Sequence, residues 1–186
     1  VMAVLMFVMA NALSTWCLNY IPTGLASLIG ALYPLSVVII EKVFYKSGKL
    51  IALTIVGLFL GITGVGIVFY ESAFSKLNSG FFIGLLLAVA AMLAWSLGTV
   101  FLARNKANIN PYYGTGWQML IASVMVWVLA ETTQPTIPYA DINWKAWSVI
   151  FYLVILGSVI SFVAFIYSMK QLPTAIASLY AYINPL

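Results

Sequence analysis

Charged residues divide this chain into long intervals that contain no charge at all. Asp, Glu, Lys and Arg are absent from residues 1–40, 50–70, 77–103, 107–130, 146–169 and 171–186. About 20 helical residues cross the hydrocarbon core of a bilayer, so most intervals predict one membrane span and the first predicts two. The first interval divides at Pro22, because proline lacks an N–H and biases the preceding residue away from helix.

This pattern predicts seven membrane spans. We expect them at residues 1–19, 23–42, 50–70, 81–103, 114–131, 147–169 and from 174 onward. The spans are apolar on every face, whereas the strands of a transmembrane barrel alternate apolar and polar positions, so helices are favoured. The predicted fold class is an all-α, polytopic membrane protein.

Composition excludes several classes of protein. The chain is 64% hydrophobic and 6% charged, so a water-soluble globule could not cover its surface. The sequence has no His and a single Cys, Cys17, which excludes a disulfide within the chain and the common zinc, haem and iron–sulfur sites. We therefore expect no metal and no cofactor. The net charge of +4 reflects a bias among loops and does not indicate nucleic-acid binding.

A fourteen-residue segment occurs twice. Residues 22–35 and 173–186 are identical at seven of fourteen positions, with a constant offset of 151, and each segment carries two prolines twelve residues apart. An internal duplication explains this best. About five predicted crossings separate the copies, so they should enter the bilayer in opposite directions, as in inverted-repeat transporters.

The duplication predicts the domain organisation. Residues 1–70 would be the last three helices of a first repeat, and residues 81–186 the first four helices of a second, with its fourth helix incomplete. Extending each repeat through the offset predicts a fragment, truncated at both ends, of a protein with two five-helix repeats and about 300 residues.

Lys and Arg indicate the orientation. The loops after the second, fourth and sixth predicted spans hold six of these residues, and the loops after the third and fifth hold two. By the positive-inside rule the first set is cytoplasmic, which places Thr23 outside and Thr174 inside. Glu41 lies at a cytoplasmic end, where it is either a paired or solvated charge or a proton-coupling site.

The repeated prolines indicate where a substrate could bind. A proline within a helix frees the carbonyl four residues earlier, and transporters commonly bind substrate at such interruptions. The predicted substrate cavity contains Ser27, Gly30, Pro34, Trp95, Gln118, Ser178, Tyr182, Asn184 and Pro185. Helix kinking by the prolines, and close packing through Ala26 and Gly30 or Ala177 and Ala181, remain alternatives. Asn11, Trp16 and Tyr167 are further polar positions within spans.

Several segments resemble the EamA-type branch of the drug/metabolite transporter superfamily. They are Leu172–Leu186 after Tyr167–Lys170, together with Trp95–Val100 and Trp117–Met119. The resemblance implies a carrier in the cell membrane, for bacteria the inner membrane, that exports amino acids, other metabolites or drugs by alternating access. It also implies cytoplasmic termini for the intact protein, in agreement with the charge bias.

The leading hypothesis is a secondary transporter of a small organic solute within the lipid bilayer, and not an enzyme. A phosphate-binding Gly-Lys-Ser/Thr loop is absent from the sequence, which argues against direct drive by ATP. A membrane-embedded enzyme acting on lipid-linked substrates and a structural membrane subunit are the alternatives. The sequence leaves open the substrate, the coupling ion, the direction of transport and whether the protein forms a homodimer.

Overall fold

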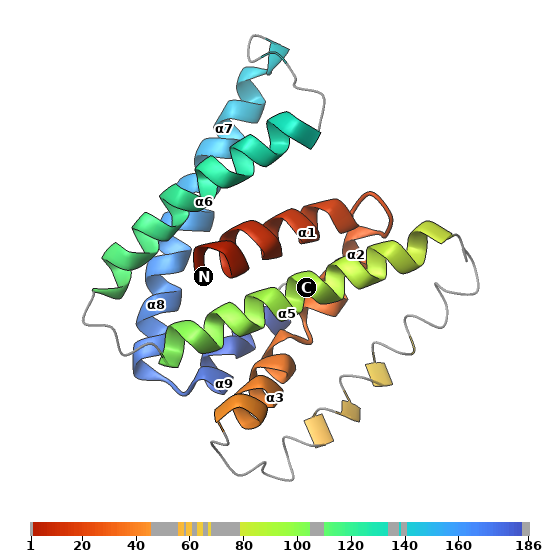
Figure 1. Ribbon diagram of the computed structural model, residues 1–186, viewed down its shortest axis with the longest axis vertical. Helices are drawn as coiled ribbons and strands as arrows, with labels where there is room; N and C mark the ends of the chain where they lie inside the picture. Colours follow the sequence, from red (N-terminus) through yellow and green to blue (C-terminus); the bar gives the residue numbers. More distant parts are fainter. Residues whose placement is uncertain are drawn as a thin grey trace.

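The computed structural model describes residues 2–45, 79–104, 110–133 and 141–183, with Pro138 and isolated positions between 56 and 67. The span predicted at 50–70 lies mostly outside these residues, as do Asn184 and Pro185. Figure 1 shows the arrangement of the helices. They are η1 (Ala3–Met9), α1 (Ala10–Cys17), α2 (Thr23–Gly30), α3 (Tyr33–Tyr45), α5 (Ser79–Arg104), α6 (Pro111–Thr133), α7 (Trp144–Tyr152), η3 (Leu153–Ile160), α8 (Ser161–Gln171), α9 (Thr174–Ala177) and η4 (Ser178–Ile183).

The described residues form helices and no strands, which confirms the predicted all-α fold class. Four helical segments are long and apolar enough to cross a membrane: Thr23–Tyr45, Gly80–Arg104, Pro111–Thr133 and Trp144–Gln171. Each coincides with a predicted span. The first predicted span corresponds to a shorter apolar helix, Ala3–Cys17. The chain is therefore a polytopic helical membrane protein.

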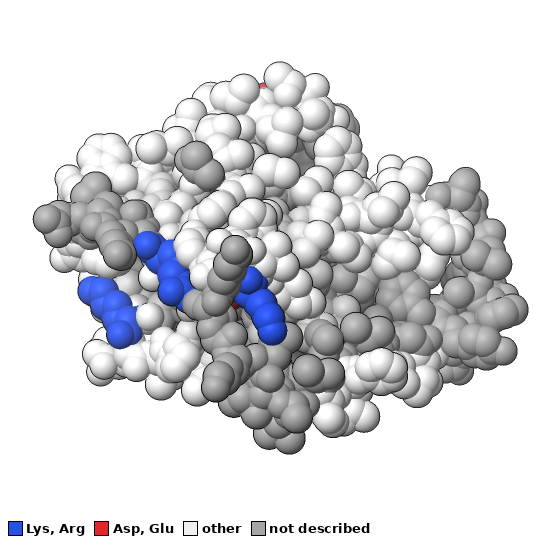
Figure 2. Space-filling view, turned by 60° about the horizontal axis from the view of Figure 1, so that its bottom comes forward, with Lys and Arg blue, Asp and Glu red and all other residues white. Residues whose placement is uncertain are grey.

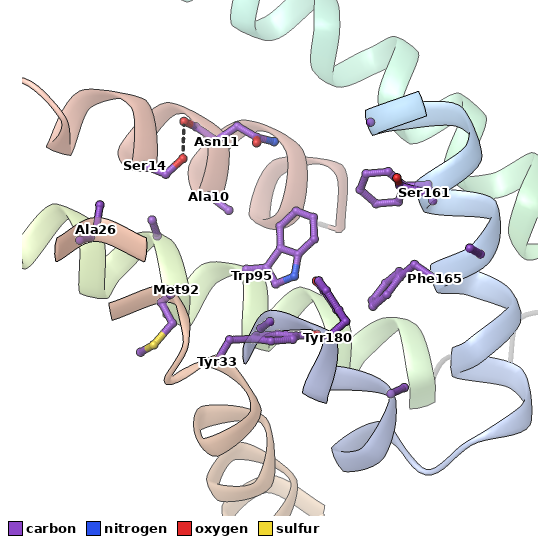
Figure 3. Close-up of a pocket in the computed structure, with 18 of the residues that line it drawn as sticks. Ala10, Asn11, Ser14, Ala26, Tyr33, Met92, Trp95, Ser161, Phe165 and Tyr180 are labelled. Carbon is purple, nitrogen blue, oxygen red and sulfur yellow. Dashed lines mark hydrogen bonds between the residues drawn. The ribbon is translucent and has the colours of Figure 1, made fainter. Parts of the chain in front are cut away.

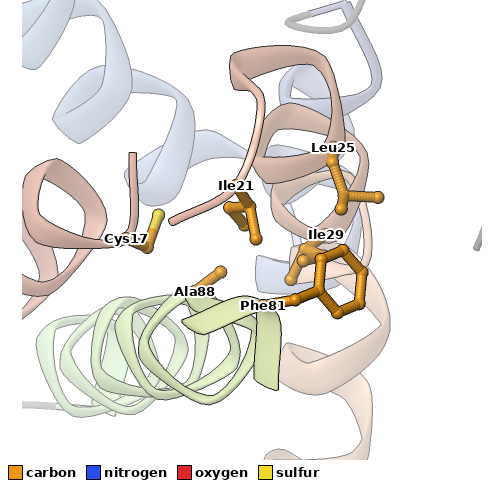
Figure 4. Close-up of a cluster of buried hydrophobic side chains, with 6 residues drawn as sticks. All are labelled: Cys17, Ile21, Leu25, Ile29, Phe81 and Ala88. Atoms are coloured by element: carbon orange, nitrogen blue, oxygen red, sulfur yellow. The ribbon is translucent and has the colours of Figure 1, made fainter. Parts of the chain in front are cut away.

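Helix α5 is the centre of the bundle and packs against η1, α1, α2, α3 and α9. On one side, Cys17, Ile21 and Ile29 are buried against Phe81 and Ala88 of α5 (Figure 4). Two further clusters join α5 to α3 and η4, and η1 to α6 and α8. By contrast, α6 and α7 expose most of their large apolar side chains, as suits helices that face lipid or other apolar segments.

Three buried hydroxyl groups donate to carbonyls of the preceding helical turn. Ser96 donates to the Met92 carbonyl at 2.7 Å, and Thr99 donates to the Trp95 carbonyl at 2.9 Å. Ser178 donates in the same way to the Ala175 carbonyl at 2.8 Å. A hydroxyl that bonds to the preceding helical turn can be buried in an apolar bundle at little cost.

Several Lys and Arg side chains lie close together at one end of the bundle, which is its charged end (Figure 2). Arg104, at the end of α5, forms an ion pair of 3.3 Å with Glu41 near the end of α3. Lys170, at the end of α8, lies 4.5 Å from the ring of Tyr112 at the start of α6. The ends of α3, α5 and α8 therefore share one side, as the alternation of Lys/Arg-rich loops predicts.

The two copies of the duplicated segment begin at opposite ends of α5. Pro22 follows Tyr20, whose side chain lies against Gly80 and Gly84 at the start of α5. Pro173 follows Lys170, which belongs to the charged end of the bundle where α5 finishes. The two copies therefore enter the bundle from opposite sides.

The helices that precede the two copies share an unusual change of conformation. Each contains a π-helical stretch, η1 or η3, and continues as α-helix, α1 or α8, from positions that are related by the 151-residue offset. The second helix differs in that α7 precedes its π-helical stretch. The N–H of Ala10 donates to the carbonyl of Leu5, and the equivalent N–H of Ser161 donates to the carbonyl of Leu156. Long π-helical stretches are rare, and these two end at positions that match by the offset of the sequence repeat.

The two Pro-Thr turns also have matching backbones. Pro22 and Pro173 are extended N-cap residues with ψ of 148° and 142°. The Pro22 carbonyl accepts from Leu25 and Ala26 at 3.0 and 3.1 Å, and the Pro173 carbonyl accepts from Ile176 and Ala177 at 2.9 and 3.0 Å. Proline suits this position because the first N–H groups of a helix have no partner within it.

The helix that contains Pro34 is interrupted, as the sequence predicts. Helix α2 ends at Gly30, Ala31 and Leu32 form a turn, and Pro34 occupies the first turn of α3, where its missing N–H costs no helical hydrogen bond. The second copy changes from α-helix to 3₁₀-helix after Ala177, which is four positions earlier in the repeat than the end of α2 at Gly30.

Candidate functional site

A cavity of about 710 Å³ lies among α1, α2, α3, α5, η3, α8, α9 and η4 (Figure 3). This volume is within the range of sites for small organic ligands. Each of these elements contributes to the described lining residues: Ala10, Asn11, Ser14, Cys17, Ala26, Gly30, Tyr33, Ala88, Ala91, Met92, Trp95, Gly157, Ser161, Phe162, Ala164, Phe165, Ser168, Ala177, Tyr180 and Ala181.

The lining repeats with the offset of the duplication. Six pairs of lining residues are separated by 151 positions: Ala10 and Ser161, Asn11 and Phe162, Ser14 and Phe165, Cys17 and Ser168, Ala26 and Ala177, and Gly30 and Ala181. The segments 10–30 and 161–181, which are related by this offset, therefore face the same cavity. Helix α5 adds Ala88, Ala91, Met92 and Trp95 to the lining.

One wall of the cavity is aromatic. The ring of Trp95 lies 5.9 Å from that of Phe162, and Phe162 lies 6.2 Å from Phe165. Tyr180 continues the series, at 5.7 Å from Phe165 and 5.9 Å from Tyr33. In Figure 3 the Trp95 side chain rises from α5, and Phe165 and Tyr180 lie on its side nearer to α8. These five rings form a continuous series in which every pair except Tyr33 and Tyr180 is edge-to-face, an arrangement that is favourable for aromatic pairs.

The wall formed by α1 is polar. Asn11 donates its side-chain amide to the carbonyls of Phe7 and Met6, at 3.0 and 3.3 Å. Ser14 donates to the Asn11 carbonyl at 3.0 Å, the bond drawn in Figure 3. The carbonyls of Met6 and Phe7 belong to the π-helix, whose hydrogen bonds span five residues. Asn11 therefore stabilises the transition between η1 and α1 at the edge of the cavity.

Tyr33 ties the interrupted helix to the centre of the bundle. Its hydroxyl donates to Thr99 of α5 at 2.9 Å, and both residues are buried. Its ring meets Tyr180 of the second copy at 5.9 Å. Tyr33 thus connects the break in the first copy, the central helix and the second copy.

The structure places the residues of the predicted cavity in different environments. Gly30 and Trp95 line the cavity. Ser27, Pro34, Gln118 and Ser178 are half-buried or buried and are not among the described lining residues. The side chains of Tyr182, Asn184 and Pro185 lie outside what the structure describes.

In the first copy, Ala26, Gly30 and Tyr33 line the cavity. Gly30 belongs to the predicted cavity, whereas Ala26 and Tyr33 line it one position before the predicted Ser27 and Pro34. The small residues Ala26, Gly30, Ala177 and Ala181, for which close packing was the alternative, are all among the lining residues. Phe162 and Phe165 line the cavity but are not among the predicted cavity residues. The duplication could have identified them, because they lie 151 positions after Asn11 and Ser14, two polar or small positions of the first predicted span.

Charge is absent from the described cavity lining, which contains no Asp, Glu, Lys or Arg. Glu41 is paired with Arg104 at the charged end of the bundle, outside this lining. The described residues also contain no cluster of His, Cys, Asp or Glu able to hold a metal ion.

The chain matches the family model described as the EamA-like transporter family over residues 82–186. The match covers more than half of the chain and includes α5, α8, α9 and η4, which contribute lining residues to the cavity, together with α6 and α7.

Named relatives are bacterial transporters. The chain is 26% identical to uncharacterized transporter YvbV of Bacillus subtilis (strain 168), over 78% of this chain and 46% of the relative. It is 25% identical to uncharacterized inner membrane transporter YedA of Escherichia coli (strain K12), over 89% of this chain and 51% of the relative. The chain spans about half the length of the curated relatives it matches. No solved structure matches it significantly.

Proposed function

Because the chain belongs to the EamA-like transporter family, we propose that the intact protein is a secondary-active exporter of a small organic solute, such as an amino acid, another metabolite or a drug. The solute binds in the cavity between the two copies. The observation that carries this proposal is the lining itself, in which six pairs of residues are related by the 151-residue offset. Transporters with inverted repeats bind substrate at such an interface between repeats.

The proposed domains follow from the same relation. Residues 1–70 belong to a first repeat and residues 81–186 to a second, inverted relative to the first. The two Pro-Thr turns lie at opposite ends of α5, which supports the inversion. The start of the family match at residue 82 supports the boundary. The cavity is lined within one chain, so the proposal needs no second copy.

Alternating access requires the two halves to rock about the cavity. The non-α segments at residues 31–32 and 178–183 suit this motion, because the ends of helical elements can absorb changes in backbone angles. The contact between Tyr33 and Tyr180 lies between these two segments and would break and re-form as the halves move.

We assign the charged end of the bundle to the cytoplasm and the protein to the bacterial inner membrane. Lys42, Arg104 and Lys170 lie at the ends of α3, α5 and α8, and Lys145 is at the start of α7. This three-to-one bias supports a cytoplasmic location for the charged end by the positive-inside rule. Both termini of the intact protein would then be cytoplasmic.

Labelling of single cysteines tests the inversion. In a Cys17→Ala background, Thr23→Cys should react with a membrane-impermeant maleimide added outside intact cells, and Thr174→Cys should react only in inside-out vesicles. Wild-type protein is the control, because Cys17 is buried and should stay unlabelled. Labelling of both introduced cysteines from the same side would contradict the inverted arrangement.

Flux measurements test transport directly. Full-length protein in proteoliposomes, loaded with a panel of amino acids, other metabolites and drugs, should release at least one of them with saturable kinetics. The same assay with and without a pH gradient identifies coupling to protons. Release no faster than from protein-free liposomes for every solute in the panel would contradict the proposed function.

A further inference from the structure

Four of the polar groups that line the cavity donate their protons to other groups of the protein. Both N–H groups of the Asn11 amide are donated to carbonyls of η1. The hydroxyl of Ser14 is donated to the Asn11 carbonyl, and that of Ser161 is donated to the Leu156 carbonyl at 2.6 Å. The hydroxyl of Tyr33 is donated to Thr99. These four lining groups therefore have no proton left to give to a ligand.

The same groups keep their lone pairs. Carbonyl oxygens only accept hydrogen bonds, so the nitrogen of the Asn11 amide must face Met6 and Phe7, which leaves Oδ1 as an acceptor. The oxygens of Ser14 and Ser161 retain acceptor capacity in the same way. Asn11, Ser14 and Ser161 thus present acceptors to the cavity, which suits a ligand that brings its own N–H groups.

The aromatic wall has the same electrostatic preference. The faces of Trp, Tyr and Phe rings are electron-rich and attract cations that lie within about 6 Å of a ring centroid. Trp95, Phe162, Phe165 and Tyr180 follow one another at centroid distances of 5.7 to 6.2 Å. A cation beside this wall therefore lies within range of two neighbouring rings.

Resting on the proposed function, we propose that the cavity binds a monovalent organic cation, with an ammonium group on a compact organic body. Lone pairs and ring faces both stabilise positive charge, and the described lining offers no Lys or Arg to hold an anion. Desolvating a charge is costly without such compensation, and the lone pairs of α1 together with the four ring faces supply it to a cation. A neutral solute would fill the cavity but would interact only weakly with its lone pairs and ring faces.

The duplication predicts how the ligand is oriented in the cavity. Asn11 and Ser14 of the first copy correspond to Phe162 and Phe165 of the second, so symmetry-related positions present acceptors on one side and rings on the other. An ammonium group with an N–H can face the acceptors of α1 while its remaining surface contacts the rings. Phe162 and Phe165 are therefore expected to determine selectivity for charge.

Three probes of nearly equal size separate charge from shape: 2-phenylethylammonium, 2-phenylethanol and phenylacetate. Their binding to full-length protein in detergent would be measured by isothermal titration calorimetry at pH 7. We expect the cation to bind roughly tenfold or more tightly than the alcohol, and the anion to bind most weakly. Equal binding of the three probes, tighter binding of phenylacetate, or no binding of the cation would overturn the proposal.

Phe165→Leu removes a ring face and keeps an apolar side chain of similar size. It should weaken binding of 2-phenylethylammonium roughly threefold to thirtyfold and change binding of 2-phenylethanol by less than about twofold. Phe151→Leu is the matched control, because Phe151 is exposed on α7 and is not among the described lining residues. An equal loss for both probes in Phe165→Leu would contradict the role of the ring face.

The binding experiment tests the ligand class, and the flux experiment tests the transporter, so either proposal can be rejected without the other. Selective binding of the cation without flux of any solute would reject the transporter and retain the ligand class. Flux of an anionic solute by protein that does not bind 2-phenylethylammonium would retain the transporter and reject the ligand class.

Discussion

Gly30→Leu is expected to block transport while the protein still folds. Gly30 lines the cavity, and a Cβ at this position would meet no other atom within 4 Å, so the new side chain extends into open space. Overpacking a bound solute costs about 1–3 kcal/mol, which corresponds to roughly a fivefold to hundredfold loss of affinity. Leucine also favours helix more than glycine does, so thermal stability should be retained or slightly increased.

Gly24→Leu is the matched control for this substitution. Gly24 lies on the same helix, is exposed, and also has no atom within 4 Å of an added Cβ, but it is not among the described cavity residues. Flux of the transported solute into proteoliposomes should fall for Gly30→Leu and remain near wild type for Gly24→Leu. Equal flux by the two variants would show that the cavity is not the transport path.

Gly98→Val should cause the largest loss of stability. Met6 of η1 lies directly against Gly98 of α5, where an added Cβ would overlap its side chain, and Met6 is 1% exposed. Neither residue can move away without separating η1 from α5. We expect a cost of about 1–3 kcal/mol or more, seen as a fall of about 5 °C in the Tm of the purified protein in detergent.

Two variants identify the cause of that loss. Gly116→Val on α6 should change Tm little, because no atom lies within 4 Å of an added Cβ at this position. Met6→Ala combined with Gly98→Val should recover part of the lost stability, since removing the Met6 side chain makes room for valine. A Tm for Gly98→Val as high as that of Gly116→Val would contradict the close contact between η1 and α5.

Span positions could be predicted from the sequence because the bilayer imposes a simple rule on composition. A segment such as 81–103 must be apolar on every side to cross hydrocarbon, and the structure has α5 at Ser79–Arg104. The break near Pro34 was predictable for an equally local reason, the missing N–H of proline. Residue-level cavity positions were not predictable in this way, because a small side chain such as Ala26 fits a packed interface and a cavity equally well.

By itself, the sequence determined the helical class, the approximate spans, the duplication and the interruption near Pro34, since each depends on local composition or on comparison of the chain with itself. Tertiary structure alone decided which faces meet. The turn at residues 31–32 brings Tyr33 and Gly30 into the cavity, and the crossing of α1, α5 and α8 brings Asn11 opposite rings that are about 150 residues distant. These contacts depend on how helices pack across the bundle, which no single segment encodes.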